Sequence, residues 1–212
     1  MYKDMTKSMR PVWASVAVAA ALWFVMFSPL TAAHVNFWIV MTCAAVTLTT
    51  LSTIFGREWI GSLRPTVHNI LLGIAIAFCL WCVFWVGGKI APLILPFASE
   101  QVGMIYSTRA QASPVVIAVL LLLIIGPAEE IFWRGFVQRR LMERYSPNAS
   151  FLIATALYTL IHIWALNFML LVAALVAGFA WGLIYRFFPQ RLTALIISHA
   201  LWDAFAFVIL PF

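Results

Sequence analysis

Long runs of apolar residues dominate the chain, and short clusters of charge, proline or glycine separate them. A helix that crosses a bilayer needs about 20 mostly apolar residues. Seven runs meet this requirement: Pro11–Ala33, Val35–Phe55, Val67–Gly87, Pro114–Phe136, Ala149–Ala165, Phe168–Phe188 and Leu192–Phe212. The pattern therefore predicts an all-α fold, a polytopic transmembrane helical bundle of about seven spans.

Two runs need a closer reading. Ile90–Ala98 is apolar but short and contains Pro92 and Pro96, so we expect an interfacial or re-entrant piece, with an eighth span as the alternative. The first run follows Lys3, Lys7 and Arg10, as the apolar core of a signal peptide would. Such cores span about 7–15 residues, and this run is longer, so we expect a retained membrane anchor.

Composition supports a membrane protein. Apolar residues make up 65% of the 212 residues and charged residues only 9%, whereas soluble domains are about a quarter charged. This excludes an ordinary soluble domain and a disordered chain. A net charge of +6 could indicate nucleic-acid binding, but in membrane proteins excess Lys and Arg marks the cytoplasmic loops, so we expect no nucleic-acid partner.

The basic residues are distributed unevenly between the two sides of the predicted bundle. With seven spans, ten of them fall on the side of the N-terminus and only Lys89 and Arg109 on the other. The ten are Lys3, Lys7, Arg10, Arg57, Arg64, Arg139, Arg140, Arg144, Arg186 and Arg191. The positive-inside rule then predicts a cytoplasmic N-terminus. We expect an integral protein of a bacterial inner (cytoplasmic) membrane.

One integral membrane domain over residues 1–212 accounts for the chain, since no internal repeat is detectable. Residues 1–113 would supply N-terminal spans and a connecting loop over 99–113, and residues 114–212 a catalytic core. Cys79-x-x-Cys82 has the spacing of a redox or zinc pair, but in an apolar helix we interpret it as packing. Gly178-x-x-x-Gly182 indicates close helix packing.

Six ionisable residues remain inside the predicted spans: Glu129, Glu130, Arg134, His162, His199 and Asp203. A charged group within the bilayer costs about 2.5–3.5 kcal/mol on insertion scales, so each needs a partner or a task. The spacing of four residues pairs Glu130 with Arg134, and His199 with Asp203. Glu129 is rotated by about 100° from Glu130 and has no counter-charge on its own helix.

Four of these six residues, from three different spans, are predicted to lie at about one depth in the bilayer. At about 1.5 Å per residue from the cytoplasmic helix ends, Glu129, His162, His199 and Asp203 lie roughly 15, 22, 12 and 18 Å deep. A carboxylate and an imidazole at one level can share a water and take its proton. A second imidazole and another polar group can stabilise the oxyanion formed at a carbonyl.

Three motifs carry a resemblance to a known family. They are Glu129-Glu130-x-x-x-Arg134, Tyr158-x-x-x-His162 and His199-x-x-x-Asp203, each on a separate predicted helix. In this order they resemble the CPBP intramembrane proteases, named for CAAX proteases and bacteriocin-processing enzymes, which include the type II CAAX prenyl endopeptidases. The resemblance covers about residues 114–212.

The resemblance implies a glutamate-type intramembrane endopeptidase. In that reading Glu129 and His162 activate water, while His199 and Asp203 form the oxyanion site. Glu130, Arg134 and Tyr158 would support them. The prenyl endopeptidases carry Asn where this chain has Asp203, and an ionised Asp cannot donate a hydrogen bond to an oxyanion. The implied partner is a membrane-associated peptide or protein, with the lipid bilayer around the enzyme; the sequence does not define the oligomeric state.

Several other functions fit parts of the pattern. The polar groups could hold the bundle together, or relay protons in a transporter. Transporters of that kind carry duplicated halves, and only Gly126-Pro127 interrupts a span here. Glu129, His162, His199 and Asp203 could also bind zinc, but the His-Glu-x-x-His register is missing, so we expect no cofactor. A non-catalytic immunity or adaptor protein of the same family is the last alternative.

Overall fold

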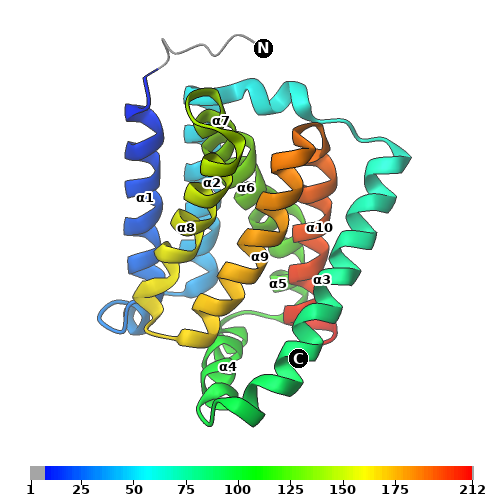
Figure 1. The fold of residues 1–212 in the computed structure, drawn as a ribbon. Helices are drawn as coiled ribbons and strands as arrows, with labels where there is room; N and C mark the ends of the chain where they lie inside the picture. Colours follow the sequence, from blue (N-terminus) through cyan, green and yellow to red (C-terminus); the bar gives the residue numbers. More distant parts are fainter. Residues whose placement is uncertain (1–7, 212) are drawn as a thin grey trace.

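The computed structural model describes residues 8–211, and these residues form helices with no strand among them. Lys3 and Lys7, which contribute to the predicted charge bias, lie outside the described residues, as does Phe212 at the predicted end of the last span. Figure 1 shows the helices as one bundle, with the start of α1 at the upper end. The predicted all-α fold is confirmed.

Seven helical stretches in the described part of the chain are long and apolar enough to cross a membrane, as the pattern predicted. They are Arg10–Phe27, Phe37–Ser62, Val67–Ile94, Pro114–Arg144, Pro147–Ala165, Phe168–Phe187 and Pro189–Ile209. The helices in chain order are α1 (Arg10–Phe27), α2 (Phe37–Gly56), α3 (Val67–Ile94), α4 (Ala98–Ser107), α5 (Pro114–Leu120), α6 (Gly126–Glu130), α7 (Arg139–Arg144), α8 (Pro147–Leu160), α9 (Phe168–Phe187) and α10 (Leu192–Ala204).

Side-chain caps explain where most spans begin. A short polar side chain accepts the otherwise unpaired backbone N–H three residues further on. The capping residues are Asn36, Thr66, Ser113, Ser146 and Asn167, at the starts of α2, α3, α5, α8 and α9. The first span differs at its other end, because α1 stops at Phe27 rather than at Ala33, and a 3₁₀ turn over Ala32–His34 follows.

The expectation of a separate piece at Ile90–Ala98 is wrong. α3 continues to Ile94 with Pro92 inside it, and only then does the chain turn into α4. A proline removes one backbone hydrogen bond, but the surrounding helix tolerates this near its end. The predicted loop over 99–113 is also largely helical, because α4 and a 3₁₀ turn over Thr108–Gln111 occupy most of it.

The fourth span is irregular in a way that shapes the site. Two π-helical segments, η4 (Leu121–Ile125) and η5 (Ile131–Gln138), flank the five residues of α6. Every residue of η5 is buried. π-helical turns occur often at functional sites, where they change the direction in which side chains project.

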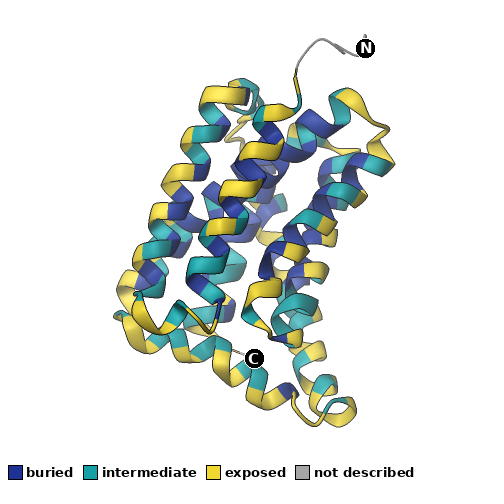
Figure 2. Cartoon of the chain, turned by 90° about the vertical axis from the view of Figure 1, so that its left-hand side faces the viewer, coloured by how far each residue is buried: buried dark blue, intermediate teal, exposed yellow. Residues whose placement is uncertain are grey.

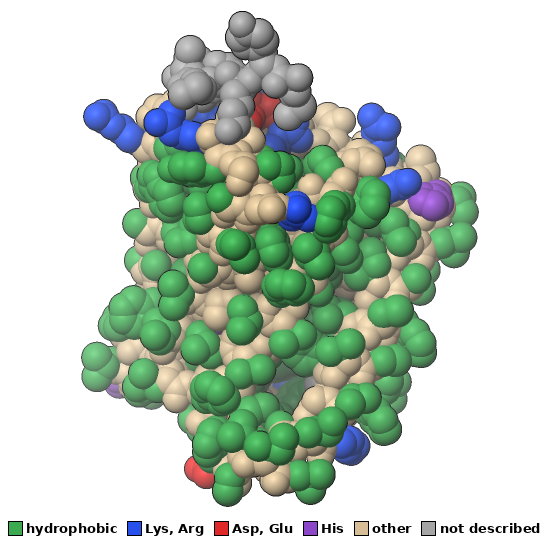
Figure 3. All heavy atoms as spheres, in the orientation of Figure 1, with side chains coloured by type: hydrophobic (Ala, Val, Ile, Leu, Met, Phe, Trp, Pro, Cys, Tyr) green, Lys and Arg blue, Asp and Glu red, His purple; other side chains and the backbone are tan. Residues whose placement is uncertain are grey.

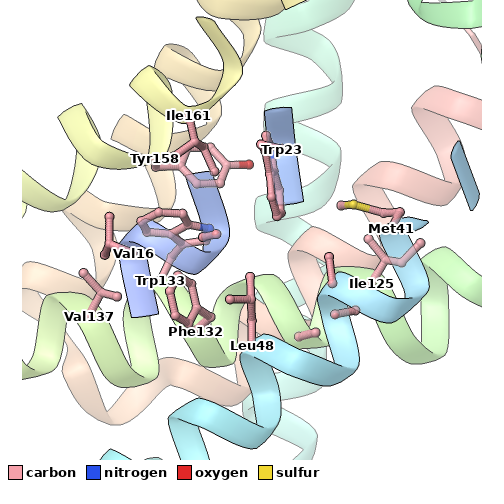
Figure 4. Close-up of a cluster of buried hydrophobic side chains, with 14 of the residues drawn as sticks. Val16, Trp23, Met41, Leu48, Ile125, Phe132, Trp133, Val137, Tyr158 and Ile161 are labelled. Carbon is pink, nitrogen blue, oxygen red and sulfur yellow. The ribbon is translucent and has the colours of Figure 1, made fainter. Parts of the chain in front are cut away.

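Buried side chains line the inside of the bundle, and exposed ones cover its outside (Figure 2). One buried cluster joins α1, α2, α8 and the fourth span, and includes Trp23, Phe132, Trp133 and Tyr158 (Figure 4). A second cluster joins α3, α9 and α10 around Trp181. Large apolar residues remain exposed on the outside, as a lipid-facing surface requires.

Basic side chains gather at the end of the molecule where α1 begins (Figure 3). This matches the charge bias along the chain, and the cytoplasmic location of that end stays a prediction. The division of the chain into residues 1–113 and 114–212 also stays a prediction.

Candidate active site

Three spans bring the motif residues together inside the bundle. The fourth span supplies Glu129, Glu130 and Arg134, the α8 span supplies Tyr158 and His162, and α10 supplies His199 and Asp203. All but Asp203 are buried, and the Asp203 side chain is 16% exposed. The sequence predicted this convergence from helix depth.

Glu130 is fully buried and joins two of the three spans. Its Oε1 accepts a hydrogen bond of 2.8 Å from Nη1 of Arg134, which is the ion pair that the spacing predicted. The same oxygen lies 2.8 Å from Nδ1 of His199. Glu130 therefore fixes the position of His199 relative to the fourth span.

Arg134 extends this network to α9. Its Nη2 donates to the backbone carbonyl of Gly178 at 3.0 Å, and its guanidinium lies over the rings of Tyr158 and Trp181, 5.0 and 5.7 Å from their centroids. A Cβ at Gly178 would lie 2.7 Å from Cδ1 of Tyr158, so only glycine allows this approach. The predicted close packing at Gly178 is present and also serves a buried charge.

Gln138 repeats this arrangement one turn along. It is fully buried, and its Nε2 donates to the carbonyl of Gly182 at 2.8 Å. The sequence reading missed it, although a polar residue four positions after Arg134 inside a span was a usable signal. Arg134 and Gln138 thus hold the fourth span against α9 through two carbonyls that lie one helical turn apart.

His199 is held on three sides. Trp181 stacks on its ring with centroids 3.9 Å apart and an interplanar angle of 16°. The Trp181 indole in turn donates to Oγ of Ser198 at 3.1 Å. Oδ2 of Asp203 lies 3.5 Å from Nε2 of His199, so Glu130 and Asp203 face opposite nitrogens of one ring.

Gly126 allows α10 to come close enough for these contacts. A Cβ at this position would lie 2.7 Å from Cα and 2.8 Å from N of Ala200, the residue after His199. The backbone of Ala200 cannot move aside for an added Cβ as a flexible side chain could. The glycine that the sequence marked as a break in the span is thus the point where α6 and α10 touch.

His162 has partners on both ring nitrogens. Nδ1 lies 2.8 Å from the carbonyl oxygen of Tyr158, and Nε2 accepts a hydrogen bond of 3.1 Å from the indole of Trp23. The sequence reading did not foresee Trp23, which comes from α1. His162 lies at the site as predicted, with its nitrogens occupied by protein groups.

Glu129 differs from Glu130, whose Oε1 is held by Arg134 and His199 while only its Oε2 lacks a partner within the described part of the chain. Glu129 is buried, and its Oε2 has no hydrogen-bond partner among residues 8–211. The Tyr158 hydroxyl lies near enough to interact with the carboxyl group. The carboxyl group is also close enough to interact electrostatically with His199 and Asp203. Glu129 therefore has an oxygen free to bind a molecule that enters the site.

The other candidates from the sequence lie apart from this site. Cys43, Cys79 and Cys82 are free thiols, and His34 and His68 are exposed near span ends. Within the described residues, no three His, Cys, Asp or Glu side chains are grouped so that they could hold a metal ion.

The bundle and its buried Glu–His cluster are those of an integral membrane protein with ionisable groups inside its spans. Residues 111–205 match the family described as type II CAAX prenyl endopeptidase Rce1-like. This segment contains all three motifs, so the match supports the resemblance to the CAAX proteases. No curated protein and no solved structure matches the chain.

Proposed function

We propose that this protein is an intramembrane endopeptidase that hydrolyses a peptide bond of a membrane-associated protein or peptide. The observation that carries the proposal is Glu129, a buried carboxylate with an unpaired oxygen beside His199. Burying a carboxylate with an unpaired oxygen is costly, so a role in binding water and substrate explains its presence better than packing does. The match of residues 111–205 to a protease family supports the same reaction class.

In the proposed reaction, Oε2 of Glu129 accepts a hydrogen bond from water and takes its proton. The hydroxide formed attacks the carbonyl carbon of the peptide, and the carbonyl oxygen becomes an oxyanion. Glu129 then passes the proton to the departing amine. One water is consumed, and one carboxylate and one amine are formed. His162 is assigned to the same water, with its Nε2 as the acceptor.

His199 is assigned to the oxyanion. Nδ1–H donates to the Glu130 carboxylate, which leaves Nε2 to face the space next to Asp203. A proton on Nε2 would donate to the oxyanion, and the Trp181 stack holds the ring plane while it does so.

Asp203 is assigned a different role from the one that the resemblance implied. A carboxylate 3.5 Å from Nε2 of His199 can accept from that ring and orient it in the resting protein, and the oxyanion takes over this hydrogen bond when it forms. A carboxylate cannot itself donate to an oxyanion. We therefore assign Asp203 to the orientation of His199, and Glu130 and Arg134 to the support of the site.

The experiment compares the termini of membrane proteins in cells that produce the wild-type protein, Glu129→Gln or Glu100→Gln. Glu100 is an exposed carboxylate on α4 and serves as the matched control. We expect mass spectrometry to find new termini with the wild type and Glu100→Gln, and none with Glu129→Gln. Retained proton-coupled flux in Glu129→Gln, without proteolysis by any variant, would favour the transporter instead.

A further inference from the structure

Trp23 reaches the site from outside the matched segment. It lies on α1, is 1% exposed, and donates its indole N–H to Nε2 of His162 at 3.1 Å. An indole nitrogen can only donate, so Nε2 of His162 must be the acceptor and carries no proton. Nδ1 must then carry the proton and donate to the carbonyl of Tyr158 at 2.8 Å.

The position of the His162 ring does not depend on the indole N–H. The Tyr158 carbonyl alone selects the Nδ1–H tautomer. The rings of Trp23, Phe27 and Tyr158 pack around the imidazole with centroids 5.9, 5.8 and 5.3 Å away. Figure 4 shows Trp23 and Tyr158 in the buried hydrophobic cluster, with the Tyr158 hydroxyl pointing toward Trp23. The indole N–H instead occupies the lone pair on Nε2 of His162, which is the only one on the ring that could accept a hydrogen bond from water.

We infer that Trp23 acts through His162, because its indole N–H caps Nε2 of that ring in the resting protein. A water that occupies the site must displace the indole N–H before it can donate to Nε2. The inference rests on the proposed role of His162 in water activation. It adds a residue of α1 to a site otherwise built from the C-terminal half of the chain.

The strength of the Trp23–His162 hydrogen bond determines how much kcat should change when the indole N–H is removed. A neutral hydrogen bond in a folded protein has a small net value, because water competes for the same groups. Removing the N–H while keeping the ring should raise kcat about three- to tenfold, which corresponds to about 0.7–1.4 kcal/mol. KM should not change, because the indole does not contact the substrate in this account.

The experiment uses Trp23→Phe, which keeps an aromatic ring without an N–H, and Trp13→Phe as the control. Trp13 lies on the same helix and is 42% exposed. The full-length protein is reconstituted in lipid nanodiscs, and peptide hydrolysis is measured together with the ¹⁵N resonances of its labelled histidines. His162→Gln assigns the His162 signals among those of the four histidines.

We expect an unprotonated Nε2 in the wild type and a shift of its resonance to lower field in Trp23→Phe, with no change in Trp13→Phe. A protonated Nε2 in the wild type, or a kcat in Trp23→Phe that is unchanged or lower, would overturn the cap. If Trp23→Phe does not fold, benzothienylalanine at position 23 replaces the N–H by sulfur at nearly the same volume. The ¹⁵N measurement needs no turnover. It therefore tests whether Trp23 caps Nε2 of His162 even if the protein shows no peptidase activity.

Discussion

The buried pair of Glu130 and Arg134 allows a quantitative test of the site's architecture. Arg134→Met removes the guanidinium but keeps an apolar stem, which leaves Glu130 buried at 0% exposure without its ion-pair partner. Removing one member of a buried pair costs about 3–5 kcal/mol, because the remaining charge keeps its desolvation penalty. The bond to the Gly178 carbonyl is also lost.

Glu130→Gln combined with Arg134→Met should recover part of this loss, since the double variant has no unpaired buried charge. We expect the two changes to couple by at least about 2 kcal/mol in a double-mutant cycle. The free energy of unfolding is measured by titrating SDS into detergent micelles that hold the protein. Arg144→Met is the control, because Arg144 is exposed and a surface change stays within about 0.5 kcal/mol.

Two results would refute the reasoning. One is a loss below about 1 kcal/mol for Arg134→Met, which would mean that water or lipid headgroups reach Glu130. The other is a double variant whose destabilisation equals the sum of the two single ones. Peptidase activity should fall in both Glu130→Gln and the double variant, because a neutral amide oxygen holds His199 more weakly than the Glu130 carboxylate does.

Three further predictions concern helix contact, the role of Asp203 and metal dependence. Gly126→Ala should lower the free energy of unfolding by about 1–3 kcal/mol, because the new Cβ meets the backbone of Ala200; Gly103→Ala, where a Cβ meets nothing within 4 Å, should not, and equal effects in chemical denaturation would contradict the contact. Asp203→Asn should retain part of kcat, since its amide oxygen can still accept from His199, whereas Asp203→Leu should lose it; equal rates would remove Asp203 from the mechanism. Exhaustive chelation should leave the hydrolysis rate unchanged, and a stoichiometric metal found by elemental analysis of the purified protein would favour zinc-dependent hydrolysis instead.

The sequence predicts the number of spans and the convergence of the site because both follow from one-dimensional quantities. Span number depends on run length, and the pairing of Glu130 with Arg134 depends on helical spacing. The direction in which each side chain of the fourth span projects does not follow from spacing. Two π-helical segments flank α6 and replace the regular α-helix that the spacing assumes.

The partners of the site were harder to predict than its ionisable members. Trp23 and Trp181 sit in apolar spans, where an aromatic residue is expected for packing alone, and no local pattern marks the indole that donates to His162 or stacks on His199. The end of α3 was also misjudged, because Pro92 and Pro96 suggested a break, while the helix passes through the first and ends before the second.

The most direct test of the central claim is hydrolysis in H₂¹⁸O by purified protein in liposomes, using the substrate that the comparison of termini identifies. The wild type should place one ¹⁸O in the new carboxyl terminus of the product, and Glu129→Gln, at equal amount and equal folding, should form no product above background. Hydrolysis by Glu129→Gln at a rate near that of the wild type would contradict the assignment of Glu129 as the base that activates water.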